Sequence, residues 1–214
     1  MALPEHSKII NRTAKKVFNE YGIVQKGQSR IWLDDQYWYS TIIEFQPSGR
    51  ARGTYLNIGI CFHWYKQDHL SFDIGYREKG FCEYKNEEQF ENIVIEFVKL
   101  GLEKVLLIRK KLVDLQSTQE TILNYDFERD TVWSNYHKAI ISGLNNQPNE
   151  SERYFNLILK NKLEYDWQLE LKLKVEQLIL DLNNISDFKS NINEVIMISR
   201  NEKKLKSTSK INVW

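Results

Sequence analysis

The chain has 214 residues, of which 42% are hydrophobic and 13% aromatic, which is sufficient for a sizeable core and argues against disorder through most of its length. Thirty basic residues against 29 acidic ones leave a formal net charge of +1, whereas dedicated nucleic-acid-binding domains carry a strong basic excess. Nucleic acid is therefore disfavoured as a partner. It is kept only as a minor alternative because of local basic groups such as Arg50 and Arg52.

The compartment is predicted from the cysteines and from the absence of long apolar runs. Cys61 and Cys82 lack the CxxC spacing of a zinc or redox site, and two free cysteines are typical of a reducing compartment. Residues 1–16 have no signal-peptide pattern, and no run approaches the roughly 18 apolar residues of a membrane helix. We therefore expect a cytoplasmic protein with no membrane partner, no metal and no cofactor.

The first predicted elements are one helix and the start of a sheet. Residues 5–21 have apolar side chains at helical spacing, and Gly22 follows where a glycine often ends a helix. Extended segments follow within residues 22–84. Of these, residues 30–48 are predicted to turn back at the adjacent Asp34 and Asp35, since acidic pairs favour a turn over a strand.

Two further segments alternate strongly between apolar and polar side chains. Residues 54–66 form the clearest strand, and residues 69–78 repeat the pattern. The connectors 47–53 and 66–69 are short enough for hairpins, so the sheet is expected to be an antiparallel meander of four or five strands.

After Asn86 the apolar spacing changes from a period of two to the helical period. Asn86 is a favourable N-cap for the next helix, and Asp130 is expected to cap another. The predicted helices cover residues 86–112, 130–144, 149–163, 166–184 and 186–205. The fold class is therefore α+β: an N-terminal helix, an antiparallel four- to five-stranded meander and a C-terminal run of helices. The expected domains are a sheet domain at 1–125, a helical extension packed on it at 126–205, and a loose tail at 206–214.

Three short segments carry a resemblance to a known family: "YGIVQKGQSRIW", "IIEFQPS" and "GTYLNIGI". Across residues 8–115 the chain resembles the bacterial family catalogued as domain of unknown function 4304, with Gln46, Asn57 and Gly59 at its marked positions. The resemblance implies an α+β fold and no known activity. It also implies an interaction or immunity role, because some small bacterial families of this kind occur near toxin systems or mobile elements.

Strand alternation defines the candidate binding site. Leu56, Ile58, Ile60, Phe62 and Trp64 are expected to face the helices, and the intervening residues to face away. The candidate residues on that second face are Glu44, Gln46, Tyr55, Asn57, His63, Asp73 and Arg77. Gly59 and Gly75 are expected to leave a shallow depression between them. The alternative is an ordinary solvated sheet face.

No motif supports catalysis. Cys61 and His63 lie two residues apart on one strand, roughly 6–7 Å, whereas a thiolate–imidazole pair requires hydrogen-bond contact. A metal site from His63, His69 and Asp73 has no ligand spacing such as HExxH to support it. The chain also contains no P-loop, GxGxxG or GxSxG sequence. No catalytic residue and no metal ligand is therefore assigned.

The hypothesis that follows is a non-enzymatic protein-interaction module, associated with immunity or mobile elements. A small-ligand-binding or hydrolytic protein that uses the polar sheet face is the alternative. Aromatic residues also recur in the helical half, where they form either the core or a partner groove, because tyrosine and tryptophan are enriched at interface hot spots. These residues are Trp133, Tyr136, Tyr154, Phe155, Tyr165 and Trp167.

Overall fold

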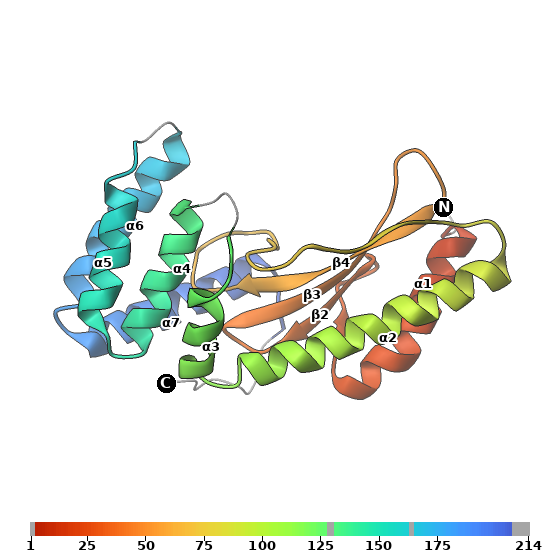
Figure 1. Ribbon diagram of the computed structural model, residues 1–214, viewed down its shortest axis with the longest axis horizontal. Helices are drawn as coiled ribbons and strands as arrows, with labels where there is room; N and C mark the ends of the chain where they lie inside the picture. The colour runs from red at the N-terminus through yellow and green to blue at the C-terminus, as the bar shows by residue number, and fades with distance from the viewer. Residues whose placement is uncertain (1–2, 128–130, 163–164, 207–214) are drawn as a thin grey trace. The chain divides into compact units, whose positions relative to one another are not determined.

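The computed structural model describes residues 3–127, 131–162 and 165–206. An N-terminal helix, five antiparallel strands and a series of helices confirm the predicted α+β fold (Figure 1). The elements in chain order are α1 (Glu5–Phe18), the 3-10 helix η1 (Asn19–Tyr21), β1 (Val24–Gln25), β2 (Ile31–Asp35), β3 (Tyr39–Gln46), β4 (Gly53–Phe62), β5 (Arg77–Glu83), α2 (Glu87–Lys111), α3 (Leu115–Leu123), α4 (Thr131–Leu144), α5 (Pro148–Leu159), α6 (Asp166–Asp181) and α7 (Ile185–Glu202).

The chain folds as two compact units. Unit 1 is Met1–Phe62 with Leu70–Lys110, and unit 2 is His63–His69 with Lys111–Trp214. The sequence analysis predicted domains at 1–125 and 126–205, and α3 was not among its predicted helices. In the structure α3 packs against α4 and so belongs to unit 2.

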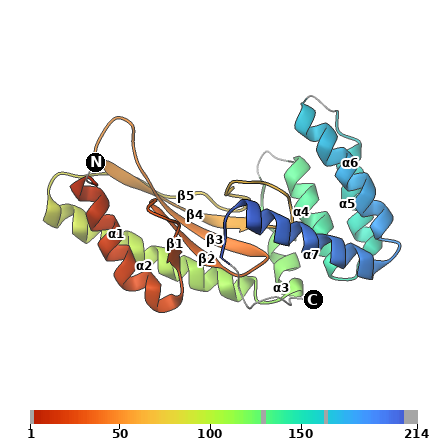
Figure 2. The same ribbon diagram turned by 180° about the vertical axis from the view of Figure 1, so that it is seen from behind.

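The sheet of unit 1 has the strand order β1-β2-β3-β4-β5, which is the predicted meander (Figure 2). Its centre is the pairing of β3 with β4, which runs without interruption from Tyr39 opposite Phe62 to Gln46 opposite Tyr55. Side chains alternate between faces along each strand, so this register decides which residues meet on each side.

One face of the sheet is covered by α1 and α2 (Figure 1). Leu56 and Ile58 of β4 are buried there in a cluster with side chains of both helices, as the alternation predicted. The other predicted core residues, Ile60, Phe62 and Trp64, are also buried, although Trp64 belongs to unit 2. Burial of this apolar face is the main favourable contribution to the folding of unit 1.

The connection from β4 to β5 differs from the prediction. Residues 69–78 were expected to form a strand, whereas β5 begins only at Arg77 and residues 70–76 make a single isolated bridge, between Ile74 and Ile60. Gly75 has a φ of 80°, a left-handed conformation that interrupts regular extended structure. Alternation alone could not reveal this interruption.

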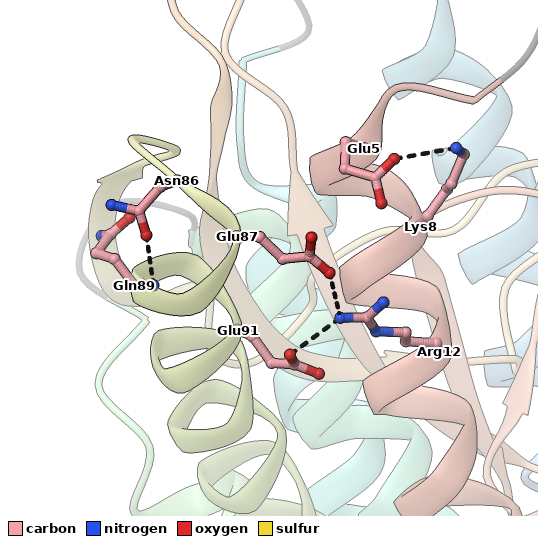
Figure 3. Close-up of polar contacts among 7 residues, drawn as sticks. All are labelled: Glu5, Lys8, Arg12, Asn86, Glu87, Gln89 and Glu91. Carbon is pink, nitrogen blue, oxygen red and sulfur yellow. Dashed lines mark hydrogen bonds and ion pairs between the residues drawn. The ribbon is translucent and has the colours of Figure 1, made fainter.

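Polar contacts between α1 and α2 lie on the exposed side of the helix pair (Figure 3). Arg12 of α1 donates to Glu87 and Glu91 of α2, each over 2.9 Å. The Oδ1 atom of Asn86 accepts a hydrogen bond of 2.9 Å from the backbone N–H of Gln89, which is the predicted cap of α2. These exposed ion pairs are screened by water, so they orient the helices more than they stabilise them.

A second arginine, Arg109, joins α2 to the buried end of β2. It donates to both carboxylate oxygens of Asp34, over 3.0 Å from Nε and 2.7 Å from Nη2, and Nη2 also donates to the backbone oxygen of Tyr21. Asp34 is only 1% exposed, and the side-chain amide of Gln36 donates to it as well. Burial and the Asp34 charge together raise the pKa of the nearby Tyr39 phenol.

Unit 2 consists of α3 to α7 and the segment between β4 and residue 70. Trp64 in this segment is fully buried, and its Nε1 donates to Nδ1 of His137 over 3.0 Å. The hydroxyl of Tyr136 donates to the backbone oxygen of Trp64 over 3.0 Å, and burial raises the pKa of that hydroxyl. Tyr136 and Phe155 are thus core residues, which is one of the two roles considered for the aromatic residues of the helices.

The helices predicted after residue 130 correspond to α4, α5, α6 and α7. The predicted cap Asp130 and residues 207–214 of the predicted tail lie outside the described residues. The additional helix α3 is capped by Asp114, whose Oδ1 accepts from the N–H of Ser117 over 2.7 Å. Its buried side chains include Thr118 and Gln119, so a search for apolar periodicity misses it.

The first prediction compares the two arginines that join separate elements of unit 1. Arg109→Ala is expected to lower the free energy of unfolding by about 3 kcal/mol, because the buried carboxylate of Asp34 loses its charge partner. Arg12→Ala, which removes only exposed ion pairs, is expected to cost far less. Urea denaturation followed by circular dichroism measures both losses, and equal losses would contradict the assignment of Arg109 as the stabilising link.

Candidate functional site

Five of the seven candidate residues meet on the sheet face opposite α1 and α2. Glu44 lies opposite Asn57 in the register of β3 and β4, Gln46 lies opposite Tyr55, and Arg77 of β5 lies opposite Asn57. We call these five residues the Arg77 cluster. Their proximity follows from strand alternation, so the structure places these five residues on one face as expected, and their role in binding stays a prediction.

Asn57 connects the cluster from below the surface. Its Nδ2 donates to Oε2 of Glu44 over 2.6 Å and to Oε1 of Gln46 over 3.2 Å. Asn57 is 0% exposed, and its Oδ1 has no hydrogen-bond donor among the described residues. The Asn57 amide group therefore positions the side chains of Glu44 and Gln46 through its N–H donors. Its Oδ1 is a buried acceptor.

Arg77 is the exposed part of the cluster. Its Nη2 donates to Oε1 of Gln46 over 2.9 Å, so the Gln46 oxygen accepts from both Arg77 and Asn57. The guanidinium carbon lies 4.0 Å from the centre of the Tyr55 ring and 5.2 Å from that of Tyr76. Contacts of this kind combine cation–π attraction with planar stacking.

Two exposed aromatic residues that were not among the predicted site residues border the Arg77 cluster. Tyr76 is 48% exposed, and Phe81, whose ring centre lies 5.1 Å from that of Tyr55, is 36% exposed. Simple alternation placed Tyr76 on the face opposite Arg77. In the structure the Tyr76 ring lies beside the Arg77 guanidinium, because the backbone before β5 is irregular. Phe81 lay beyond the end of the predicted strand.

The other two candidates, His63 and Asp73, do not belong to the cluster. His63 follows the end of β4, is fully buried and is part of unit 2. The carboxylate of Asp73 accepts from the backbone N–H of Phe62 over 2.6 Å and from the hydroxyl of Ser71 over 2.7 Å. Asp73 therefore stabilises the connection after β4, and both residues are corrections to the predicted site.

The expected depression between Gly59 and Gly75 is filled. A Cβ atom on Gly59 would lie 2.5 Å from the backbone oxygen of Ile74 and 2.7 Å from Cδ1 of Phe72. A Cβ atom on Gly75 would lie 2.8 Å from the backbone oxygen of Ile58. The two glycines thus allow the segment 72–75 to lie directly on β4, and their small size serves chain packing.

The chemistry of this face is that of hydrogen bonding. Glu44 is the only carboxylate of the Arg77 cluster, and amide side chains do not serve as acids or bases at neutral pH. Cys61 is fully buried, and its Sγ lies 3.8 Å from the backbone oxygen of Phe62 and 3.7 Å from the Ser71 hydroxyl. A thiol that is buried beside neutral groups in this way is typical of a structural cysteine and not of a reactive one.

No group of three or more His, Cys, Asp or Glu side chains in the described ranges is arranged to hold a metal ion. Within the same part of the chain, no helix combines the length and apolar character needed to cross a membrane.

Comparison with protein-family models, curated proteins and solved structures finds no match to this chain. The resemblance to the domain of unknown function 4304 family therefore stays a prediction. The site has to be interpreted from its own geometry.

A second prediction tests the close contact at Gly59. Gly59→Ala is expected to lower the free energy of unfolding by about 2 kcal/mol, because the added methyl group displaces the segment 72–75 from β4. Gly80→Ala on β5 is the matched control, since a Cβ there meets no atom within 4 Å, and its effect should stay within about 0.5 kcal/mol. Thermal unfolding of both variants measures the difference, and a neutral Gly59→Ala would show that this segment is not tightly packed.

A third prediction concerns the charge beside Glu44. Asn57→Asp places a carboxyl group next to the Glu44 carboxylate, which raises the folded-state pKa of the introduced group above its unfolded value. A raised pKa means that stability is lost as the pH rises, so the deficit should be largest near pH 7, about 3 kcal/mol, and shrink toward pH 4. Asn57→Ala, which adds no charge, should show a smaller deficit with little pH dependence. Denaturant unfolding across this pH range tests the contrast, and parallel curves would contradict the network.

Proposed function

We propose that the protein is a non-enzymatic interaction module that binds a protein partner through the Arg77 cluster and its bordering aromatic residues. The observation that carries the proposal is an exposed arginine stacked on tyrosine at the surface of a rigid sheet. Arginine, tyrosine and tryptophan are the residue types that dominate binding energy at protein interfaces. The interaction or immunity role implied by the family resemblance belongs to the same class of function.

The cluster is organised before any partner arrives. Asn57 holds Gln46, Gln46 accepts from Arg77, and Tyr55 supports the guanidinium plane. A side chain already ordered in the free protein loses less conformational entropy on binding, and this loss is otherwise about 0.5–1.5 kcal/mol for a flexible side chain. The buried amide of Asn57 thus contributes to recognition through the position of Arg77.

The chemistry of Arg77 favours a partner with a carboxylate. A guanidinium group has five N–H donors, and Nη2 donates to the neutral oxygen of Gln46. None of the ion pairs found among the described residues involves Arg77. Its positive charge is therefore available to an acidic side chain, which arginine can bind with two parallel hydrogen bonds.

The same geometry gives less support to the alternative functions. A small ligand needs a concave site, and the backbone of residues 72–75 fills the expected depression beside Gly59. A hydrolytic site needs a nucleophile or a pair of acid–base groups, and the Arg77 cluster offers Glu44 with two neutral amides. An exposed polar cluster bordered by aromatic side chains agrees better with a protein partner.

A fourth prediction tests the proposed surface. Affinity capture from a lysate of the source organism should retain a partner on the wild-type protein and lose it on Arg77→Ala. Lys79→Ala is the matched control, because it removes the same charge from an exposed position two residues along β5. Quantitative mass spectrometry compares the captured proteins, and calorimetry with the purified partner should give a roughly thirtyfold weaker Kd for Arg77→Ala, the size of a hot-spot loss of about 2 kcal/mol. Capture that is equal for wild type and Arg77→Ala would remove this surface from consideration.

A further inference from the structure

Two positive side chains and a buried histidine lie on the other face of the sheet, where α1 begins. His6 is in the first turn of α1, Arg30 directly precedes β2, and Arg52 directly precedes β4. Arg30 connects the three segments, because its Nη2 donates to the Ser7 hydroxyl over 2.6 Å and its Nη1 donates to the backbone oxygen of Gly53 over 3.2 Å. Arg30 therefore binds Ser7, which follows His6 in sequence, and Gly53, which follows Arg52.

These charges have no carboxylate partner among the described residues. None of the ion pairs found there involves Arg30 or Arg52. Glu5, in the same turn of α1, is paired with Lys8 over 3.0 Å. Arg30 is also half-buried, and its hydrogen bonds go to two neutral oxygens, which leave its charge in place.

The electrostatic consequence is visible at His6. This side chain is mostly buried, and burial together with the positive charges of Arg30 and Arg52 lowers its pKa. The first turn of α1 adds to the same field, because the positive end of the helix dipole lies there and no side chain caps the helix. Holding like charges together costs free energy, and a bound anion would offset that cost.

We propose that His6, Ser7, Arg30 and Arg52 form a binding site for a phosphate-type oxyanion. Two guanidinium groups match the charge of a phosphate dianion and can donate several hydrogen bonds to its oxygens. The Ser7 hydroxyl is a further donor, and the positive end of the α1 dipole favours an anion at this position. The natural source is either free inorganic phosphate or the phosphate of a small phosphorylated compound. This site lies on the α1 side of the sheet and is independent of the Arg77 cluster.

Titration of the ¹⁵N-labelled full chain, followed by two-dimensional NMR at constant ionic strength, tests the site. Inorganic phosphate should cause saturable shifts of the amide signals of His6, Ser7, Arg52 and Gly53, and an equal ionic strength of sodium chloride should not. Phenyl phosphate is the second probe: tighter binding than inorganic phosphate identifies a phosphate ester as the natural ligand, and tighter binding of inorganic phosphate identifies the free ion. Either result supports the site.

Two variants separate this site from a diffuse positive surface. Arg52→Ala should weaken phosphate binding at least tenfold. Arg50→Ala, which removes the same charge two residues earlier from the exposed connection, should leave binding within a factor of two. Amide spectra of both variants without phosphate verify that the fold is kept. The proposal is overturned if the wild-type shifts do not saturate, or if Arg50→Ala weakens binding as much as Arg52→Ala does.

Discussion

The pairing of β3 with β4 is the constraint on which unit 1 depends. Eight consecutive residue pairs connect the two strands, and each pair places its two residues on the same face. A slip by one residue would move Leu56 and Ile58 out of the apolar cluster under α1 and α2, and would bring Asn57 into it. The burial of the apolar face and the assembly of the Arg77 cluster therefore follow from one register.

Much of this arrangement could be predicted because it depends on local periodicity. Alternation along β3 and β4 placed Glu44, Gln46, Tyr55 and Asn57 together, and helical spacing located α1, α2 and the four helices after residue 130. Local patterns fail where a distant contact decides the structure. His63 continues the alternation of β4 in sequence, yet the buried side chain of Trp64 binds His137 of α4 and takes this segment into unit 2. Similarly, the predicted strand at 69–78 gives way to a segment whose backbone lies against Gly59.

The two ends of the polar face differ in how they are covered, and this difference underlies the proposal of a recognition surface. At the end near Cys61, the segment 72–75 packs closely on β4, and Cys61 and Ile74 are buried. At the end near Gln46, β5 pairs with β4 along its backbone, and Arg77, Tyr76 and Phe81 stay exposed. The face therefore offers ordered side chains at its surface near Gln46, whereas the space beside Gly59 and Gly75 is occupied by the segment 72–75.

Three arginines of unit 1 differ in the groups that hold their guanidinium side chains. Arg109 meets the buried carboxylate of Asp34, so its charge is neutralised and its role is to join α2 to the sheet. Arg77 and Arg30 are held instead by neutral oxygens, from Gln46 in one case and from Ser7 and Gly53 in the other. The chain has 29 acidic residues for 30 basic ones, so a shortage of carboxylates does not explain the difference. A guanidinium that is fixed by neutral acceptors is ordered but keeps its full positive charge. Such a group can bind an external anion without first breaking an ion pair. Both the proposed partner surface at Arg77 and the proposed oxyanion site at Arg30 and Arg52 rest on this property.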